Sequence, residues 1–120
     1  ASCTKGINLP GNHKCEELQG MNKFIYEEII ISDKCNCIVS GKVKYVKDCM
    51  TIALIDYGEG ECDNIATKIL CNDGNCFGEN GSQPLLYEYT FDCNEKNITE
   101  GLVPSSEIDD LNNPNTGPQP

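Results

Sequence analysis

The stretch DKCNCIVSGKVKYVKDC (residues 33–49) decides the fold class, because it joins three cysteines to the residue pattern of a β-strand. Between the cysteines, β-branched and aromatic residues alternate with lysines, which is typical of half-exposed antiparallel strands. Ser40-Gly41 interrupts this pattern, and glycine readily adopts the positive φ that a tight turn needs. We therefore expect residues 37–49 to form a β-hairpin that turns at Gly41.

The pair Cys35 and Cys37 indicates two disulfides and not one. Along a strand, their side chains would lie on one face but about 7 Å apart, too far for a bridge between them. The pair is also tighter than the Cys-x2–4-Cys spacing of structural zinc sites, and His13 is the only histidine. We expect each cysteine to bridge to a different part of the chain, with no metal and no cofactor.

Nine cysteines in 120 residues indicate a disulfide scaffold made in an oxidising compartment. They are Cys3, Cys15, Cys35, Cys37, Cys49, Cys62, Cys71, Cys76 and Cys93. Their spacing leaves the pairings open, and the odd number leaves one thiol unpaired or bonded to another chain. Cys3 and Cys93, nearest the ends of the set, are the best candidates for that thiol.

The composition explains why bridges are needed. Only 38% of the residues are apolar, tryptophan is absent and phenylalanine occurs three times. A core this poor in large side chains buries little apolar surface against the entropy of ordering the backbone. Each disulfide typically adds about 2–4 kcal/mol, so four would supply most of the net stability of such a domain.

Four further segments predict strands from their β-branched and aromatic content: residues 23–32, 50–56, 67–71 and 85–91. In the first of them, the pair Glu27-Glu28 also allows a short helix. Residues 57–61 (YGEGE), directly after the segment 50–56, are predicted to form an acidic, glycine-rich turn. Residues 104–120 hold several prolines, no aromatic residue and no cysteine. We expect a small, disulfide-rich, mostly β fold with short antiparallel strands and long loops over residues 1–93, and a flexible, disordered acidic tail over residues 94–120.

The charge excludes several partner classes. The net charge is −10 and arginine is absent, which disfavours nucleic acid and anionic membrane surfaces. The sequons at Asn80 and Asn97 indicate glycosylation and agree with secretion. No apolar run is long enough to span a membrane, and the start Ala-Ser-Cys fits a mature terminus after cleavage of a leader. We expect a soluble, secreted, extracellular protein.

Catalytic patterns are weak. A cysteine nucleophile would need a free thiol beside His13. The acidic pairs are neighbours in sequence, which is not the arrangement of a catalytic dyad, and the chain carries no serine elbow and no phosphate-binding loop. We expect a protein that is not an enzyme.

Residues 57–76, YGEGECDNIATKILCNDGNC, resemble the cysteine-rich end of tick salivary proteins of the basic-tail and acid-tail group. In that group a D-G-T-x-C step precedes G-x-C-x-x-G-x-C, and closely spaced cysteines stand where this chain has Cys35 and Cys37. The chain departs from the pattern in Leu70, which replaces a glycine, in its longer gap between Cys71 and Cys76, and in the additional Cys93.

Residues 33–49 are also similar to the C-x-C-x3-G-x-V-x-C-x3-C core of von Willebrand factor type C modules, with Tyr45 in place of one cysteine. Together, these resemblances imply an inhibitor of host defence that binds clotting factors, complement components or chemokines.

The acidic surface favours an extracellular host protein with a basic surface as the partner. We expect contacts from the turn at residues 57–61 and from the mixed acidic and aliphatic segment at residues 107–111. The residues concerned are Tyr57, Glu59, Glu61, Glu107, Asp109 and Asp110. The alternative is a structural or adhesive extracellular module, which would self-associate or form a covalent dimer through the ninth cysteine.

Overall fold

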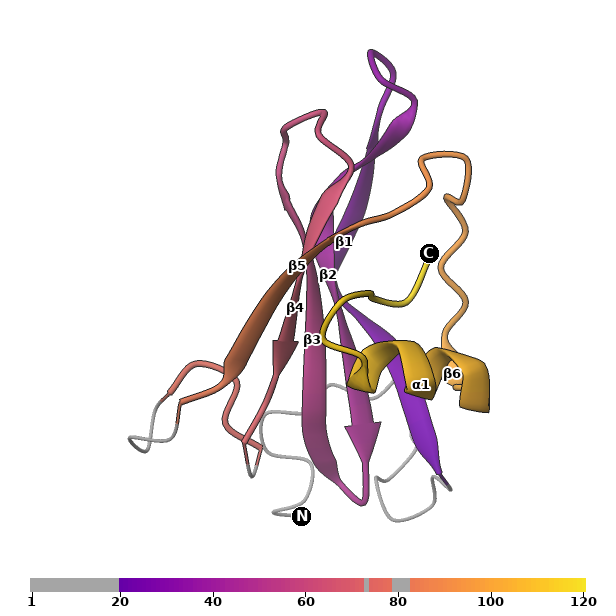
Figure 1. Cartoon of the computed structure of the whole chain (residues 1–120). Coiled ribbons are helices and arrows are strands. Elements are labelled where there is room, and N and C mark those ends of the chain that lie inside the picture. The colour runs from indigo at the N-terminus through magenta and orange to yellow at the C-terminus, as the bar shows by residue number, and fades with distance from the viewer. Residues whose placement is uncertain (1–19, 73, 79–82) are drawn as a thin grey trace.

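The computed structural model describes residues 20–72, 74–78 and 83–120. Five strands form an antiparallel meander: β1 (Met21–Ser32), β2 (Cys37–Lys47), β3 (Met50–Glu59), β4 (Ile65–Leu70) and β5 (Leu85–Thr90). The short β6 (Gly101–Leu102) pairs with the outer side of β1, and α1 (Ser105–Asn112) follows it. The sheet order is β5-β4-β3-β2-β1-β6, so the chain is mostly β, as predicted (Figure 1).

The strands predicted at residues 23–32, 50–56, 67–71 and 85–91 are confirmed as β1, β3, β4 and β5. The hairpin predicted within residues 37–49 is wrong, because β2 runs unbroken through Gly41. Gly41 has the expected positive φ of 117°, but it lies where β1 bulges against β2. A Cβ atom there would lie 2.6 Å from the Glu28 carbonyl oxygen, so the glycine permits a close approach of two strands.

The chain turns instead at Asp48 and Cys49, between the paired residues Lys47 and Met50. Both turn residues have positive φ, 52° and 65°, as a two-residue type I′ hairpin turn requires. Neither residue is a glycine. The sequence prediction relied on glycine as the turn signal and therefore placed the turn at Gly41.

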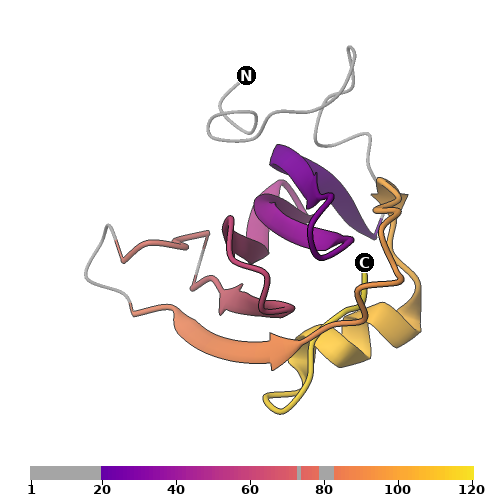
Figure 2. The ribbon, with the colours of Figure 1, turned by 90° about the horizontal axis from the view of Figure 1, so that it is seen from above.

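The sheet packs its main core against α1 and the C-terminal segment on one side, called here the helix side (Figure 2). The core residues are Met21, Cys37, Ile38, Val43, Tyr45, Ala53, Ile55, Tyr57, Ala66, Tyr89, Phe91, Val103 and Leu111. On the opposite side, Leu54 and Ile69 pack with Cys71 and Cys76 of the following loop. Most of the core therefore comes from alternate residues of the central strands and from the segments that cover them.

The segment 94–120, for which we expected a flexible tail, contains β6 and α1 and contacts the sheet. Leu111 of α1 is 2% exposed. The Tyr89 hydroxyl donates a hydrogen bond to the Pro118 carbonyl oxygen at 3.0 Å, and Gly117 lies so close to the Tyr89 ring that a Cβ atom would overlap it. The partners that hold this segment lie on strands of the sheet, so the composition of residues 94–120 alone did not indicate them.

Lys68 of β4 joins the end of α1 to the sheet. Its buried ammonium donates hydrogen bonds to the carbonyl oxygens of Asp110 (3.0 Å), Asn113 and Thr116 (2.6 Å). An eight-residue helix is marginal alone, and α1 has no basic residue in its last turn. Lys68, which lies on β4, supplies the positive charge that stabilises the C-terminus of a helix.

Three disulfides lie wholly within the described residues: Cys35–Cys62, Cys37–Cys93 and Cys71–Cys76. The prediction that Cys35 and Cys37 bridge to different parts of the chain is confirmed. Cys93 is bonded, so its nomination as the odd thiol is wrong. Cys49 is also in a disulfide, whereas Cys3 and Cys15 lie outside the described residues.

Candidate binding surface

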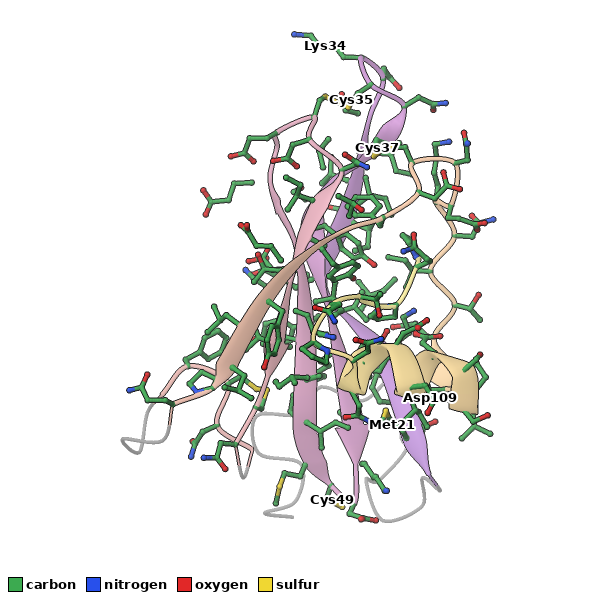
Figure 3. The ribbon with its side chains drawn as sticks, in the orientation of Figure 1. Met21, Lys34, Cys35, Cys37, Cys49 and Asp109 are labelled. Atoms are coloured by element: carbon green, nitrogen blue, oxygen red, sulfur yellow. A yellow bond between two sulfur atoms is a disulfide. The ribbon has the colours of Figure 1, made fainter. Side chains whose placement is uncertain are left out.

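Two hairpin tips stand together at one end of the sheet, above α1 in Figure 1. The first joins β1 to β2 over residues 33–36, and the second joins β3 to β4 over residues 60–64, to which we add Glu59, the last residue of β3. The disulfide Cys35–Cys62 links them, with 5.9 Å between the Cα atoms (Figure 3). Behind them, Cys37–Cys93 ties the start of β2 to the chain that follows β5.

Hydrogen bonds fix the backbone of each tip. In the first, the Asn36 N–H donates to the Ser32 carbonyl oxygen at 2.8 Å, and Asn36 has a positive φ of 53°. In the second, the Gly60 N–H donates to the carbonyl oxygen of Val39 on β2 at 2.9 Å. The two tips are therefore ordered by local bonds, by contact with each other and by a covalent bridge.

Four carboxylates are exposed on these tips: Asp33, Glu59, Glu61 and Asp63. Glu61 also accepts a hydrogen bond from the Glu59 N–H at 3.1 Å. Lys34 is the one cation in residues 59–64 and 33–36. The end of the molecule that the disulfide stabilises thus has a net negative surface, with its backbone held by the bridge and by hydrogen bonds.

Of the residues predicted to make contacts at this turn, Glu59 and Glu61 are exposed, whereas Tyr57 is buried. The Tyr57 side chain is 2% exposed and packs edge-on against Phe91, with 5.2 Å between ring centroids. Burial raises the pKa of its hydroxyl above the ordinary value. The ring belongs to the core beneath the tips and is not available to a partner.

Glu107 serves the fold. Its carboxylate accepts hydrogen bonds from the Lys23 ammonium at 2.8 Å and the Tyr45 hydroxyl at 2.5 Å. Burial, and then the hydrogen bond to Glu107, raise the pKa of Tyr45. The three side chains fasten the start of α1 to β1 and β2.

The structure does not bring the two predicted contact segments together. Asp109 is exposed on α1, well away from the tips marked by Lys34 and Cys35 in Figure 3. Asp110 is half-buried, and its carbonyl oxygen is held by Lys68. Of the predicted contact residues, only Glu59 and Glu61 lie on the tips.

Asn97, one of the two predicted glycosylation sites, is exposed and borders a groove of about 240 Å³ beside β6. Thr99, the third residue of its sequon, also lines this groove, and Lys23 and Glu107 lie within it as an ion pair. Asn80 lies outside the described residues. The exposure of Asn97 leaves room for a glycan.

Lys44 of β2 is an unusual buried cation. It lies on the side of the sheet opposite α1, between Phe24 of β1 and Leu54 of β3 in the strand register. The residue is 1% exposed, and its ammonium has no hydrogen-bond partner among the described residues; the Tyr26 ring centroid lies 5.4 Å away. Burial lowers the pKa of Lys44.

Reactive centres are scarce in the described ranges. No group of three or more histidine, cysteine, aspartate or glutamate side chains is arranged there to hold a metal ion. All seven cysteines of these ranges are in disulfides, so none offers the thiol that a cysteine nucleophile would need. No helix of the described chain is long and apolar enough to cross a membrane.

Comparison with known proteins adds no relative: no protein-family model, no curated protein and no solved structure matches the chain. The tick salivary and von Willebrand factor type C resemblances therefore remain resemblances of cysteine spacing.

Sequence reasoning missed Asp33 and Asp63 as members of the tip surface. Both lie next to a bridged region of the chain, Asp33 two residues before Cys35 and Asp63 directly after Cys62. Knowledge of the Cys35–Cys62 pairing would have found them, but the spacing of nine cysteines does not reveal it.

Proposed function

We propose that this protein is a secreted, non-enzymatic binding protein that inhibits a host-defence protein, of the clotting, complement or chemokine class, through its acidic hairpin tips. The observation that carries the proposal is the bridge Cys35–Cys62, which holds two tips bearing four exposed carboxylates as one surface. Disulfides belong to oxidising compartments, which agrees with secretion.

Rigidity supports a binding role. A surface that is already ordered loses less conformational entropy when a partner binds, so more of the contact energy appears as affinity. Four carboxylates on two short tips also attract a basic partner and accelerate its encounter. The inhibitor would work by covering a basic surface of the host protein.

The test measures binding to one purified basic member of each class: a clotting protease with a basic exosite, a complement component and a chemokine. Surface plasmon resonance at 50, 150 and 500 mM salt should find a partner whose affinity falls as salt rises, because salt screens the exposed carboxylates. The same partner should lose activity in a clotting, haemolysis or chemotaxis assay.

A matched pair of variants assigns the effect to the tips. Glu59→Gln/Glu61→Gln removes two tip charges but keeps an oxygen that can accept the Glu59 N–H. Glu88→Gln/Glu95→Gln removes two exposed charges elsewhere. The tip variant should bind at least ten times more weakly, and the control should bind like the wild type. Absence of binding in all three classes, or equal losses in both variants, would refute the proposal.

A further inference from the structure

The outer edge of β1 is open over most of its length in the described part of the chain. The strand has twelve residues, but β6 pairs only with Asn22 and Lys23. From Phe24 to Ser32 the strand forms the border of the sheet, and Figures 1 and 2 show it running past β6 toward the hairpin tip. Such an edge can accept a further strand.

Apolar side chains are exposed along this edge. Ile25, Tyr26, Ile30 and Ile31 are 40%, 42%, 43% and 43% exposed, whereas the preceding Phe24 is 4% exposed. A strand that only borders water is usually short or protected by charged side chains, proline or a β-bulge. β1 shifts register against β2 three times between Ile25 and Ile31, so an added strand would have to pair with a bulged edge. β1 offers four large apolar side chains, on both sides of the sheet, to an incoming segment.

The backbone at the start of the edge already binds a carboxylate. The Ile25 N–H donates a hydrogen bond to the Glu100 side chain at 2.7 Å, directly after the last pair between β1 and β6. That oxygen stands where the carbonyl oxygen of a longer neighbouring strand would be. The Ile25 N–H therefore points outward and can be reached from outside the sheet.

The charge along the edge is negative. Glu27 and Glu28 are both exposed in the middle of it, and Lys42 is paired with Glu27 at 3.0 Å. A second copy of this chain is a poor occupant, because antiparallel pairing centred on this segment would set the Glu27 and Glu28 pairs of the two copies against each other. An incoming strand with lysine or arginine opposite these glutamates would be attracted.

We infer that residues 25–31 take an extended segment of a partner protein, with alternating basic and apolar side chains, as an added antiparallel strand. The inference deepens the proposed function and rests on it, since β1 leads directly into the tip at residues 33–36. Main-chain hydrogen bonds would supply affinity, and the exposed isoleucines with Glu27 and Glu28 would select the segment.

The direct test is a titration of the full-length, oxidised, ¹⁵N-labelled protein with a capped Lys-Val-Lys-Val-Lys-Val peptide, followed by amide shifts and amide exchange. Saturable shifts and slowed exchange should concentrate on residues 24–32. A peptide of equal charge with proline in place of the central valine should bind at least ten times more weakly. Equal binding of both peptides would show simple charge attraction and overturn the inference.

Two variants locate the site. Ile25→Pro removes the outward N–H and should weaken binding of the Lys-Val peptide at least ten-fold. Glu28→Lys, a change at an exposed side chain, should weaken it about as much and create binding to a Glu-Val-Glu-Val-Glu-Val peptide. Glu88→Lys makes the same change of charge at an exposed residue of the opposite edge strand, β5, and should change nothing.

The alternatives give different results. Shifts centred on β5 or on the hairpin tips, or a dimer seen by sedimentation with residues 24–32 protected, would overturn the inference. The peptide measurement does not depend on the host protein. If the Lys-Val peptide does not bind residues 24–32 but the host protein still binds in a salt-dependent way, the strand site is refuted. The proposal that the hairpin tips bind the host protein would then still stand.

Discussion

The two halves of β1 show how differently the two ends of the molecule are stabilised. Met21 and Phe24 are 6% and 4% exposed, whereas Ile25 and Tyr26, the next residues along, are 40% and 42% exposed. Met21 of the first half joins the core beneath α1, and the second half leads to tips joined by Cys35–Cys62. Packing against α1 stabilises one end, and the bridges Cys35–Cys62 and Cys37–Cys93 stabilise the end that carries the tips.

The largest effect should come from breaking the bridge behind the tips, Cys37–Cys93. Cys37→Ala/Cys93→Ala opens a loop of 56 residues and should lower the free energy of unfolding by about 4 kcal/mol. Cys71→Ala/Cys76→Ala opens a loop of only 5 residues and should cost about 2 kcal/mol. Urea unfolding measures both, and equal losses would contradict the loop-entropy account.

Lys68→Met tests the packed end. It removes three hydrogen bonds from the ammonium to carbonyl oxygens at the end of α1, and we expect a loss of about 3 kcal/mol. Amide exchange should accelerate in residues 105–119 more than at the tips. Lys42→Met, at a partly exposed ion pair, should cost less than about 0.5 kcal/mol. Uniform acceleration in Lys68→Met would contradict a local anchor.

Lys44→Met should stabilise the protein. The buried ammonium has no hydrogen-bond partner within the described ranges, so an apolar chain of similar length should raise the free energy of unfolding by about 1 kcal/mol. The folded pKa of Lys44 is below its ordinary value of 10.5, so the unfolded state holds the proton over the interval between them. Wild-type stability therefore rises with pH across that interval, and the advantage of methionine shrinks.

Thermal unfolding of the wild type and of Lys44→Met between pH 7 and 10 measures the difference in their stability. A variant less stable than the wild type at pH 7 would mean that the ammonium has favourable partners. A pH-independent difference would mean that the Lys44 pKa is not lowered.

The smallest effect on stability should come from the tips. Glu59→Gln/Glu61→Gln changes exposed side chains outside the core, so the free energy of unfolding should move by less than about 0.5 kcal/mol. Chemical denaturation checks this, and a larger loss would mean that these carboxylates serve the fold and not binding.

The strands were predictable because their signals are local. Residues 23–32, 50–56, 67–71 and 85–91 carry β-branched and aromatic side chains in runs that need no knowledge of their neighbours. The hairpin turn predicted at Gly41 was wrong because local sequence cannot distinguish a turn from a bulge. The positive φ of Gly41 was expected correctly, but both structures use a positive φ. The real turn at Asp48 and Cys49 carries no glycine.

The packing of the C-terminal segment was not predictable, because its determinants are distant in sequence. Residues 105–112 have few apolar side chains and no side-chain cap, and the chain after them is held by a buried lysine on β4 and a tyrosine on β5. The same holds for the candidate surface. Glu59 and Glu61 were identified from an acidic turn, but only the bridge Cys35–Cys62 shows that Asp33 lies beside them.

The most direct test of the account is the affinity of Cys35→Ser/Cys62→Ser for the host protein found in the three-class binding assay, at a temperature where the variant remains folded. We expect at least a ten-fold weaker affinity with the amide exchange of β3 to β5 unchanged, because the two tips would no longer be held as one surface. Unchanged affinity in the folded variant would contradict the claim that the bridged acidic tips are the binding site.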